Sequence, residues 1–374
     1  MMTGSFKPID IGEWSGQAYL GPTEKLFNAI AAHDRETVQR LLQDETLDIN
    51  RRDPVGRTPL HVAALTRATD ICCDLIDAGA RMTPRLASGR TVLHIAAQMD
   101  MSVVIGKLLE RSTLNEEKAK QAEADKEAAA KKVEDDGNAS DSDGERPSSV
   151  DDWTSEDEVD DKRKTVAAAK RVIALDEPAA DDGDIPEDEM NLPDILDVNA
   201  PDWDLRFTPL AFAIVSGAPS AVDALLNAGV DPKQALMPKP NDYNSCTLHP
   251  LALATVTVNE ETAGTIVDSL LRAGASSSQA DTSLYSILHA FVSSGKLSLV
   301  EKLLKNDPTS KAAINVPAFS NMSAAYPLVT ATSKSQYAMV ALLLAYGANV
   351  SYSPEEIDRA KKMCVYNFPR LRYV

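Results

Sequence analysis

The five histidines are the side chains in which metal binding or acid–base chemistry near neutral pH would first be sought. Three of them, His61, His94 and His289, directly follow a leucine, and His249 directly precedes a Pro-Leu pair. These positions recur along the chain and do not gather in one stretch. Because a metal or acid–base site needs several such groups at one place, the spacing favours structural histidines that form hydrogen bonds within a repeated unit.

The four cysteines are Cys72, Cys73, Cys246 and Cys364, and their spacing matches neither a metal site nor a disulfide framework. Cys72 and Cys73 could form a redox pair, but adjacent side chains on a helix point apart. We therefore expect these two to be buried thiols in an apolar helix stripe. This use of cysteine favours a reducing compartment, the cytosol or the nucleus.

The sequence motifs of common catalytic sites are missing from the chain. It contains no Gly-rich phosphate loop, no Gly-x-Ser-x-Gly and no His-Glu-x-x-His. We therefore expect no catalytic, cofactor or metal site. An enzyme ranks third among the function classes that we consider.

Negative charge is concentrated in one segment. The chain has a net charge of −18, and residues 113–196 contain 27 Asp/Glu and 11 Lys/Arg, a net charge of −16. Six hydroxyl side chains in this segment have Asp or Glu three residues further on, which resembles the preference of acidophilic kinases: Ser140, Ser142, Ser148, Ser149, Thr154 and Ser155. These are candidate phosphorylation sites, although a serine in so acidic a stretch can also match the pattern by chance.

A repeated sequence motif marks the helices in which these histidines are expected to lie. Residues 58–61 read Thr-Pro-Leu-His, and residues 91–94, 33 positions later, read Thr-Val-Leu-His. Thr58 suits the N-terminal cap of a helix, and Pro59 suits its first turn, where no backbone N–H is needed. Leu60 then faces a neighbouring unit, and the alanines that follow keep this face thin enough for close stacking.

A phrase of this kind with a period of about 33 residues is the signature of the ankyrin repeat, and the chain resembles the ankyrin-repeat family. The motif residues are Thr58, Pro59, Leu60, His61, Thr91, Leu93, His94, Thr208, Pro209 and Leu210. The resemblance implies an all-α solenoid of helix-turn-helix units joined by short β-hairpin fingers, with histidines that bond within and between hairpins. One unit cannot bury its apolar face alone, so the units form an array.

Six or seven repeats are expected. Repeats one to three occupy residues 23–112, and four degenerate repeats occupy residues 197–352. The motif leucines of the later copies lie at spacings of 41, 37 and 40 residues: Leu210, Leu251, Leu288 and Leu328. Because these spacings exceed 33, we expect each later repeat to carry a lengthened hairpin.

The acidic segment interrupts the array without ending it. The apolar pattern of the third repeat stops after a second helix that should bury Val103, Val104, Leu108 and Leu109. Residues 115–132 favour a helix that packs on nothing, and residues 134–161 have the composition of a disordered chain. We assign residues 113–196 to an insertion, 1–22 to an N-terminal lead and 353–374 to a C-terminal helix and cap. This layout is also similar to that of uncharacterised fungal ankyrin proteins.

Arginines mark the first two predicted fingers. Six arginines lie there, opposed by Asp53 alone: Arg51, Arg52, Arg57, Arg81, Arg85 and Arg90. Two of the six precede the motif threonine, where polar residues are common in ankyrin repeats. We therefore single out Arg51, Arg52, Arg81 and Arg85 as candidate partner-binding residues, the alternative being a merely soluble face.

The function that best fits this sequence is non-catalytic protein binding by a scaffold or adaptor, through the fingers and the concave face. We expect another protein as the partner, no nucleic acid, no membrane insertion and a monomeric chain. The acidic insertion could regulate binding by covering the arginine fingers. The alternative function is an acidic chaperone, in which the insertion holds a basic client such as a histone.

Overall fold

The computed structural model describes residues 21–136, 192–236, 247–280, 284–320 and 323–352. Its described residues fall into two units. One unit contains residues 21–116 together with those from 194 onward, and it holds the helical array. The other contains residues 117–136 and 192–193.

The array is built from pairs of helices, in agreement with the predicted all-α class. The described residues contain seven pairs: α1 (Pro22–Ala31) with α2 (Arg35–Leu41), α3 (Pro59–Leu65) with α4 (Thr69–Asp77), α5 (Val92–Gln98) with α6 (Ser102–Asp136), α8 (Pro209–Ser216) with α9 (Pro219–Asn227), α10 (Pro250–Leu253) with α11 (Glu260–Arg272), α12 (Ile287–Ser294) with α13 (Leu297–Asn306), and α15 (Pro327–Ser333) with α16 (Tyr337–Ala345). A short 3-10 turn, η3 (Val350–Tyr352), follows the last pair.

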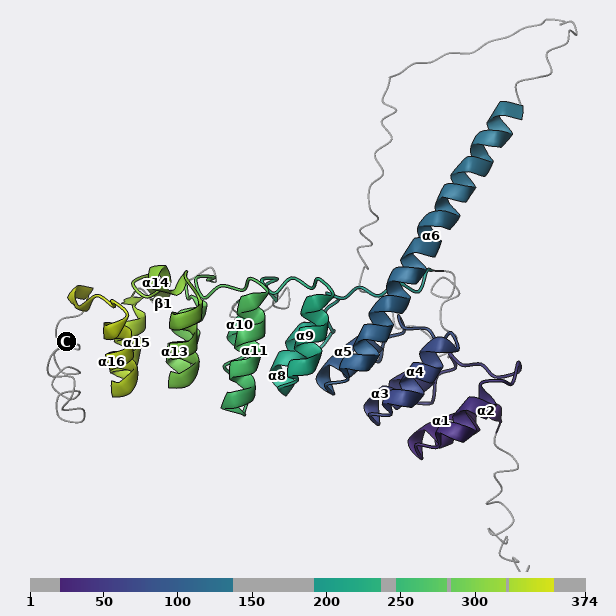
Figure 1. Cartoon of the computed structure of the whole chain (residues 1–374), viewed down its shortest axis with the longest axis horizontal. Helices are drawn as coiled ribbons and strands as arrows, with labels where there is room; N and C mark the ends of the chain where they lie inside the picture. The colour runs from purple at the N-terminus through teal and green to yellow at the C-terminus, as the bar shows by residue number, and fades with distance from the viewer. Residues whose placement is uncertain (1–20, 137–191, 237–246, 281–283, 321–322, 353–374) are drawn as a thin grey trace, which may run out of the picture. The chain divides into compact units, whose positions relative to one another are not determined.

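The first helices of successive pairs stack on one another. Contacts run from α1 through α3, α5, α8, α10 and α12 to α15. Figure 1 labels α1, α3, α5, α8, α10 and α15 in this order along the array. The motif leucines are all buried in this stack: Leu60, Leu93, Leu210, Leu251, Leu288 and Leu328. Helices α5 and α8 are direct neighbours although 110 residues lie between them in the sequence. The array therefore continues across the insertion.

The motif threonines and histidines cap the first helices together. The Thr58 hydroxyl accepts from the backbone N–H of His61, and the His61 Nδ1 lies 2.8 Å from that hydroxyl. Thr91 and His94 repeat the arrangement at 2.9 Å, as do Ser286 and His289 at 2.8 Å. Each pair satisfies backbone donors that the first turn of a helix leaves without partners.

Helix α6 differs from the prediction in two ways. It runs without a break from Ser102 to Asp136, through the expected end of the third repeat. Neither glycine nor proline interrupts residues 107–136, and the favourable i,i+4 charge pairs begin within one turn of the last buried residue. The expected burial of Val103 is wrong, since 64% of that residue is exposed. Val104 and Leu108 are buried as expected, Leu109 is partly buried, and Ile105 is buried although it was not predicted.

Two of the three later connections, from α9 to α10 and from α13 to α15, are lengthened as predicted. The expectation is wrong for the connection from α11 to α12, which has 14 residues; the wider leucine spacing there comes from the 13-residue helix α11. Fourteen residues separate α4 from α5, whereas 20 separate α13 from α15. The latter connection contains α14 (Ser310–Ala313) and an antiparallel pair of strands, β1 (Ala318–Ser320) and β2 (Ser323–Ala325). Within the described ranges these are the two named strands, so most of the expected β-hairpin fingers are tight turns rather than ladders.

Several expectations lie outside the described residues. They concern the N-terminal lead up to residue 20, the disorder expected from residue 137 to 161, all six candidate phosphorylation sites, and the C-terminal helix and cap from residue 353. Residues 134–136, which were also expected to be disordered, belong to helix α6.

Candidate protein-binding surface

Three equivalent turns of successive repeats form the fingers, and the candidate residues Arg52 and Arg85 come directly before the first two of them. The first finger (residues 53–57) is closed by a 2.9 Å bond from the backbone N–H of Asp53 to the Arg57 carbonyl. The second finger (86–90) has the equivalent bond from Leu86 to Arg90, also 2.9 Å. The third finger (202–207) follows the insertion and is one residue longer, with Asp202 bonded to the Phe207 carbonyl at 2.9 Å.

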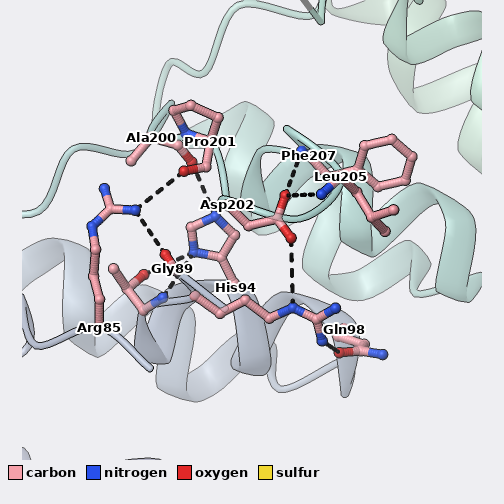
Figure 2. A network of polar contacts seen from close by, with 11 residues as sticks. Arg85, Gly89, His94, Gln98, Ala200, Pro201, Asp202, Leu205 and Phe207 are labelled. Carbon is pink, nitrogen blue, oxygen red and sulfur yellow. Dashed lines mark hydrogen bonds and ion pairs between the residues drawn. The ribbon is translucent and has the colours of Figure 1, made fainter. Parts of the chain in front are cut away.

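Two of the four candidate arginines hold neighbouring fingers together. The Nη1 atom of Arg52 donates to two backbone carbonyls, that of Gly56 at 3.3 Å and that of Arg85 at 2.8 Å. Arg85 repeats this one finger further on, donating to Gly89 at 2.7 Å and to Pro201 at 3.1 Å. Figure 2 shows the second of these forks. A guanidinium with several donors suits such bridging, so both side chains support the fingers.

The other two candidates are placed differently. Arg51 lies two residues before the first finger and is exposed. The backbone N–H of Arg81 donates to the Asn50 side-chain oxygen at 2.8 Å, which fixes the chain there, while its side chain is half-buried. The structure therefore does not bring Arg51, Arg52, Arg81 and Arg85 together as one free basic group.

Two aspartates from later in the chain, Asp194 and Asp202, contact residues in or near the second finger, and sequence reasoning missed them. Asp202 is fully buried, accepts from the backbone N–H groups of Leu205 and Phe207, and lies 3.8 Å from the Arg90 Nε (Figure 2). Asp194 accepts from the backbone of Met82 at 3.0 Å. The sequence counts Asp53 as the single opposing charge because these two residues lie more than 100 positions away.

The histidines act as expected for structural groups. His94 is buried between the Thr91 hydroxyl and the Ala200 carbonyl, the latter 3.0 Å from its Nε2 (Figure 2). Burial lowers the pKa of His94 to about 4 and that of His61 also to about 4. Both rings are therefore neutral at neutral pH.

Cys72 and Cys73 are the two cysteines among the described residues, and neither has the low pKa of a reactive thiol. Cys72 is buried, and this burial raises the pKa of its thiol to about 12; Cys73 is half-buried, and burial raises its pKa as well. Among the described residues no group of three or more His, Cys, Asp or Glu side chains could hold a metal ion. None of the helices searched in these ranges combines the length and the apolar character of a membrane span.

Trp203, at the tip of the third finger, is the most distinctive exposed side chain of this edge. It is 56% exposed, and Leu205 beside it is also exposed. Its ring lies on Gly89, where an added Cβ would come within 2.4 Å of the ring, and the Arg85 guanidinium is 6.0 Å from the ring centre. Its backbone N–H donates to Ser88 at 2.9 Å. The sequence did contain a signal for this residue. Trp203 is one of three tryptophans in the chain, and it lies between two aspartates, Asp202 and Asp204, in a segment that predicts a turn.

Comparison with known proteins identifies the repeats. The family model described as ankyrin repeats in three copies matches residues 26–119. The ankyrin repeat domain of Bcl-3 has a similar structure, with a TM-score of 0.51 at 19% sequence identity, covering 86% of this chain and 97% of that domain. The chain therefore carries ankyrin repeats and has the ankyrin-repeat fold.

Two curated relatives share a short part of the sequence. Regulatory protein NPR1 of Arabidopsis thaliana is 37% identical over 78 residues, which is 21% of this chain and 13% of that protein. The nuclear factor NF-kappa-B p105 subunit of Rattus norvegicus is 38% identical over 64 residues, 17% of this chain and 7% of that protein. The matched parts thus cover a small fraction of each relative.

Proposed function

We propose that this protein is a non-catalytic scaffold or adaptor that binds another protein through its fingers. Ankyrin repeats imply a role in protein–protein interaction, and the array presents a row of fingers with exposed tips. The observation that carries the proposal is Trp203, an exposed tryptophan held in place by Gly89 and Arg85. Tryptophan and arginine are the residues most enriched among those that dominate binding energy.

The surface we propose is centred on the third finger. Trp203 and Leu205 provide apolar contact area, and Val55 at the tip of the first finger adds another exposed apolar side chain. Arg51, two residues before the first finger, is an exposed cationic side chain. Because Trp203 is fixed by its contacts with the second finger, little side-chain freedom is lost on binding.

A pull-down with matched variants tests this function. The full chain, Trp203→Ala and Val258→Ala are immobilised, and the proteins retained from an extract are quantified by mass spectrometry. Val258 is a suitable control because it is 99% exposed and lies between α10 and α11, away from the fingers. We expect specific proteins that are retained by the full chain and Val258→Ala but lost with Trp203→Ala. Equal retention by all three would refute the proposed surface.

The acidic segment supports a second candidate function, an acidic chaperone for a basic client such as a histone. The net charge of −16 in residues 113–196 is the observation that favours it. A pull-down with residues 117–193 removed separates the two functions. Loss of a client whose binding also falls at high salt indicates the chaperone, whereas binding that survives the deletion indicates the scaffold.

Regulation and location complete the proposal. Phosphates on residues such as Ser140, Ser142 or Ser149 would add charge to the insertion and strengthen its attraction to arginine side chains. We propose the cytosol or the nucleus as its location, because Cys72 and Cys73 are free thiols and the cysteine spacing matches no disulfide framework.

A further inference from the structure

The array is assembled from two halves of the chain, and their junction contains many direct contacts. The first half is residues 21–116 and the second is residues 194–352, both within one compact unit. Helix α5 of the first half packs on α8 of the second. The Phe212 ring of α8 meets His94 edge-on at 5.8 Å and receives the Arg90 guanidinium 4.5 Å from its centre.

Asp194 fastens the beginning of the second half to the first. Its carboxylate accepts from the backbone N–H of Met82 at 3.0 Å, and from the backbone and hydroxyl of Thr83 at 2.9 and 2.8 Å. The Asn115 side chain donates to the Asp194 carbonyl at 2.8 Å, and the Leu196 N–H donates to the Ser112 hydroxyl, also at 2.8 Å. The two ends of the insertion are therefore held next to each other by the repeats themselves.

Further bonds extend the junction from the fingers to the opposite end of the helices. At the fingers, the bonds already described join Arg85 to Pro201 and His94 to Ala200. At the other end, the Asp100 carboxylate accepts from the backbone N–H of Ala221 in α9 at 2.8 Å. The two halves are thus joined along the full height of a repeat, by the same kinds of contact that join repeats within each half.

We infer that the two halves remain one folded array when the backbone is cut within the insertion. Every contact named above is non-covalent, and none of them involves residues 117–193. The intact backbone there therefore contributes only by keeping the two halves close to each other. An interface of ordinary size and packing gives dissociation constants of about 1 µM or tighter. A protease acting on the insertion would then alter the charge attached to the array but leave Trp203 seated on Gly89, although these residues belong to different halves.

The test uses the full chain with the recognition sequence of a site-specific protease placed after Asp161. The cut protein, at about 10 µM, is analysed by size-exclusion chromatography with light scattering and by thermal unfolding. We expect both fragments in one peak with the mass of the uncut chain, and a single unfolding transition. Separate elution of the fragments, or precipitation of either, would overturn the inference.

A matched pair of arginine variants tests whether the named contacts hold the halves together. Arg85→Ala removes a fork that crosses the junction, whereas Arg52→Ala removes an equivalent fork whose two acceptors lie in the first half. In the cut protein we expect Arg85→Ala to raise the dissociation constant about tenfold, the range for a hydrogen bond to a charged group, and Arg52→Ala to change it less than about twofold.

Asp194→Ala is a second junction variant and should also weaken the cut protein about tenfold. Circular dichroism of each uncut variant, in which the halves stay tethered, confirms that the repeats are folded. Equal dissociation constants for the Arg85 and Arg52 variants, or no effect of Asp194→Ala, would show that these contacts do not hold the junction.

Discussion

At the scale of single residues, the motif histidines are buried hydrogen-bonding groups whose charge state couples to folding. His61 and His94 are each about 1% exposed. Their pKa values, about 4 because of burial, lie well below the ordinary value of 6.5. Between these two values the unfolded chain binds more protons than the folded chain, so acid favours unfolding in this window.

We therefore predict that stability falls as the pH drops from 6.5 toward 4. Between pH 7 and pH 5, each of the two histidines should remove about 2 kcal/mol from the free energy of unfolding. Urea titrations at pH 7, 6 and 5 measure this change for the wild type and for His61→Gln with His94→Gln. A pH dependence that is the same with and without the histidines would contradict this account.

Gly89 and Gly56 have similar backbone conformations, but only Gly89 lies against a side chain of another finger. Both have a left-handed backbone, with φ of 79° and 83°, which an alanine adopts at a cost of about 1–2 kcal/mol. A Cβ at Gly56 would meet nothing within 4 Å, whereas at Gly89 it would lie 2.4 Å from the Trp203 ring. The third finger is therefore seated on the second through a glycine.

We predict that Gly89→Ala is more destabilising than Gly56→Ala and also displaces Trp203. Thermal unfolding and tryptophan fluorescence measure the two effects. In a Trp203→Ala background the two alanine variants should become similar, because the clash is gone while the backbone strain remains. If Gly89→Ala stays the worse variant in that background, Trp203 is not the cause.

At the scale of elements, the first helix of each repeat depends on its motif leucine. Leu60 and Leu93 are at most 1% exposed, and each lies in the contact between successive first helices. Truncation of such a side chain leaves a cavity in a close-packed stack. Because each repeat contacts only its neighbours, the loss is felt first by the adjacent repeats.

Leu60→Ala and Leu93→Ala should each lower the free energy of unfolding by about 2–5 kcal/mol. Leu65→Ala is the control in the same helix as Leu60, since Leu65 is 38% exposed and should cost less than about 1 kcal/mol. Chemical denaturation followed by circular dichroism provides the values. Costs near zero at both motif leucines would contradict the register of the repeats.

The sequence predicted some elements well because local residues define them. The starts of α3, α5 and α8 follow from their capping threonines, which act within one helical turn. The end of α6 could not be predicted from local residues, because the second helix of the third repeat runs directly into the helix-favouring residues 115–132. The buried residues of its first turns, Val104, Ile105, Leu108 and Ser112, lie on one face of the helix, and Val103 lies outside that face.

At the scale of the whole molecule, the array depends on contacts between residues that are distant in sequence. The period of the motif predicted that the fourth repeat follows the third across the insertion. It did not predict Asp194, Asp202 or Trp203, whose partners lie about 110 residues earlier. The sequence likewise predicted Arg85 as a partner-binding residue, but its side chain bonds the Pro201 carbonyl, which lies beyond the insertion, and so supports the fingers.

Replacement of residues 117–193 by a short Gly/Ser linker tests the central claim, a continuous array that folds independently of its insertion. The ends of the deletion are already adjacent, since the Asn115 side chain bonds the Asp194 carbonyl at 2.8 Å. Shortening a loop reduces its closure entropy, a gain of about 2 kcal/mol here. Thermal unfolding should therefore show one cooperative transition with an equal or higher Tm. A lower Tm, or two separate transitions, would contradict the account.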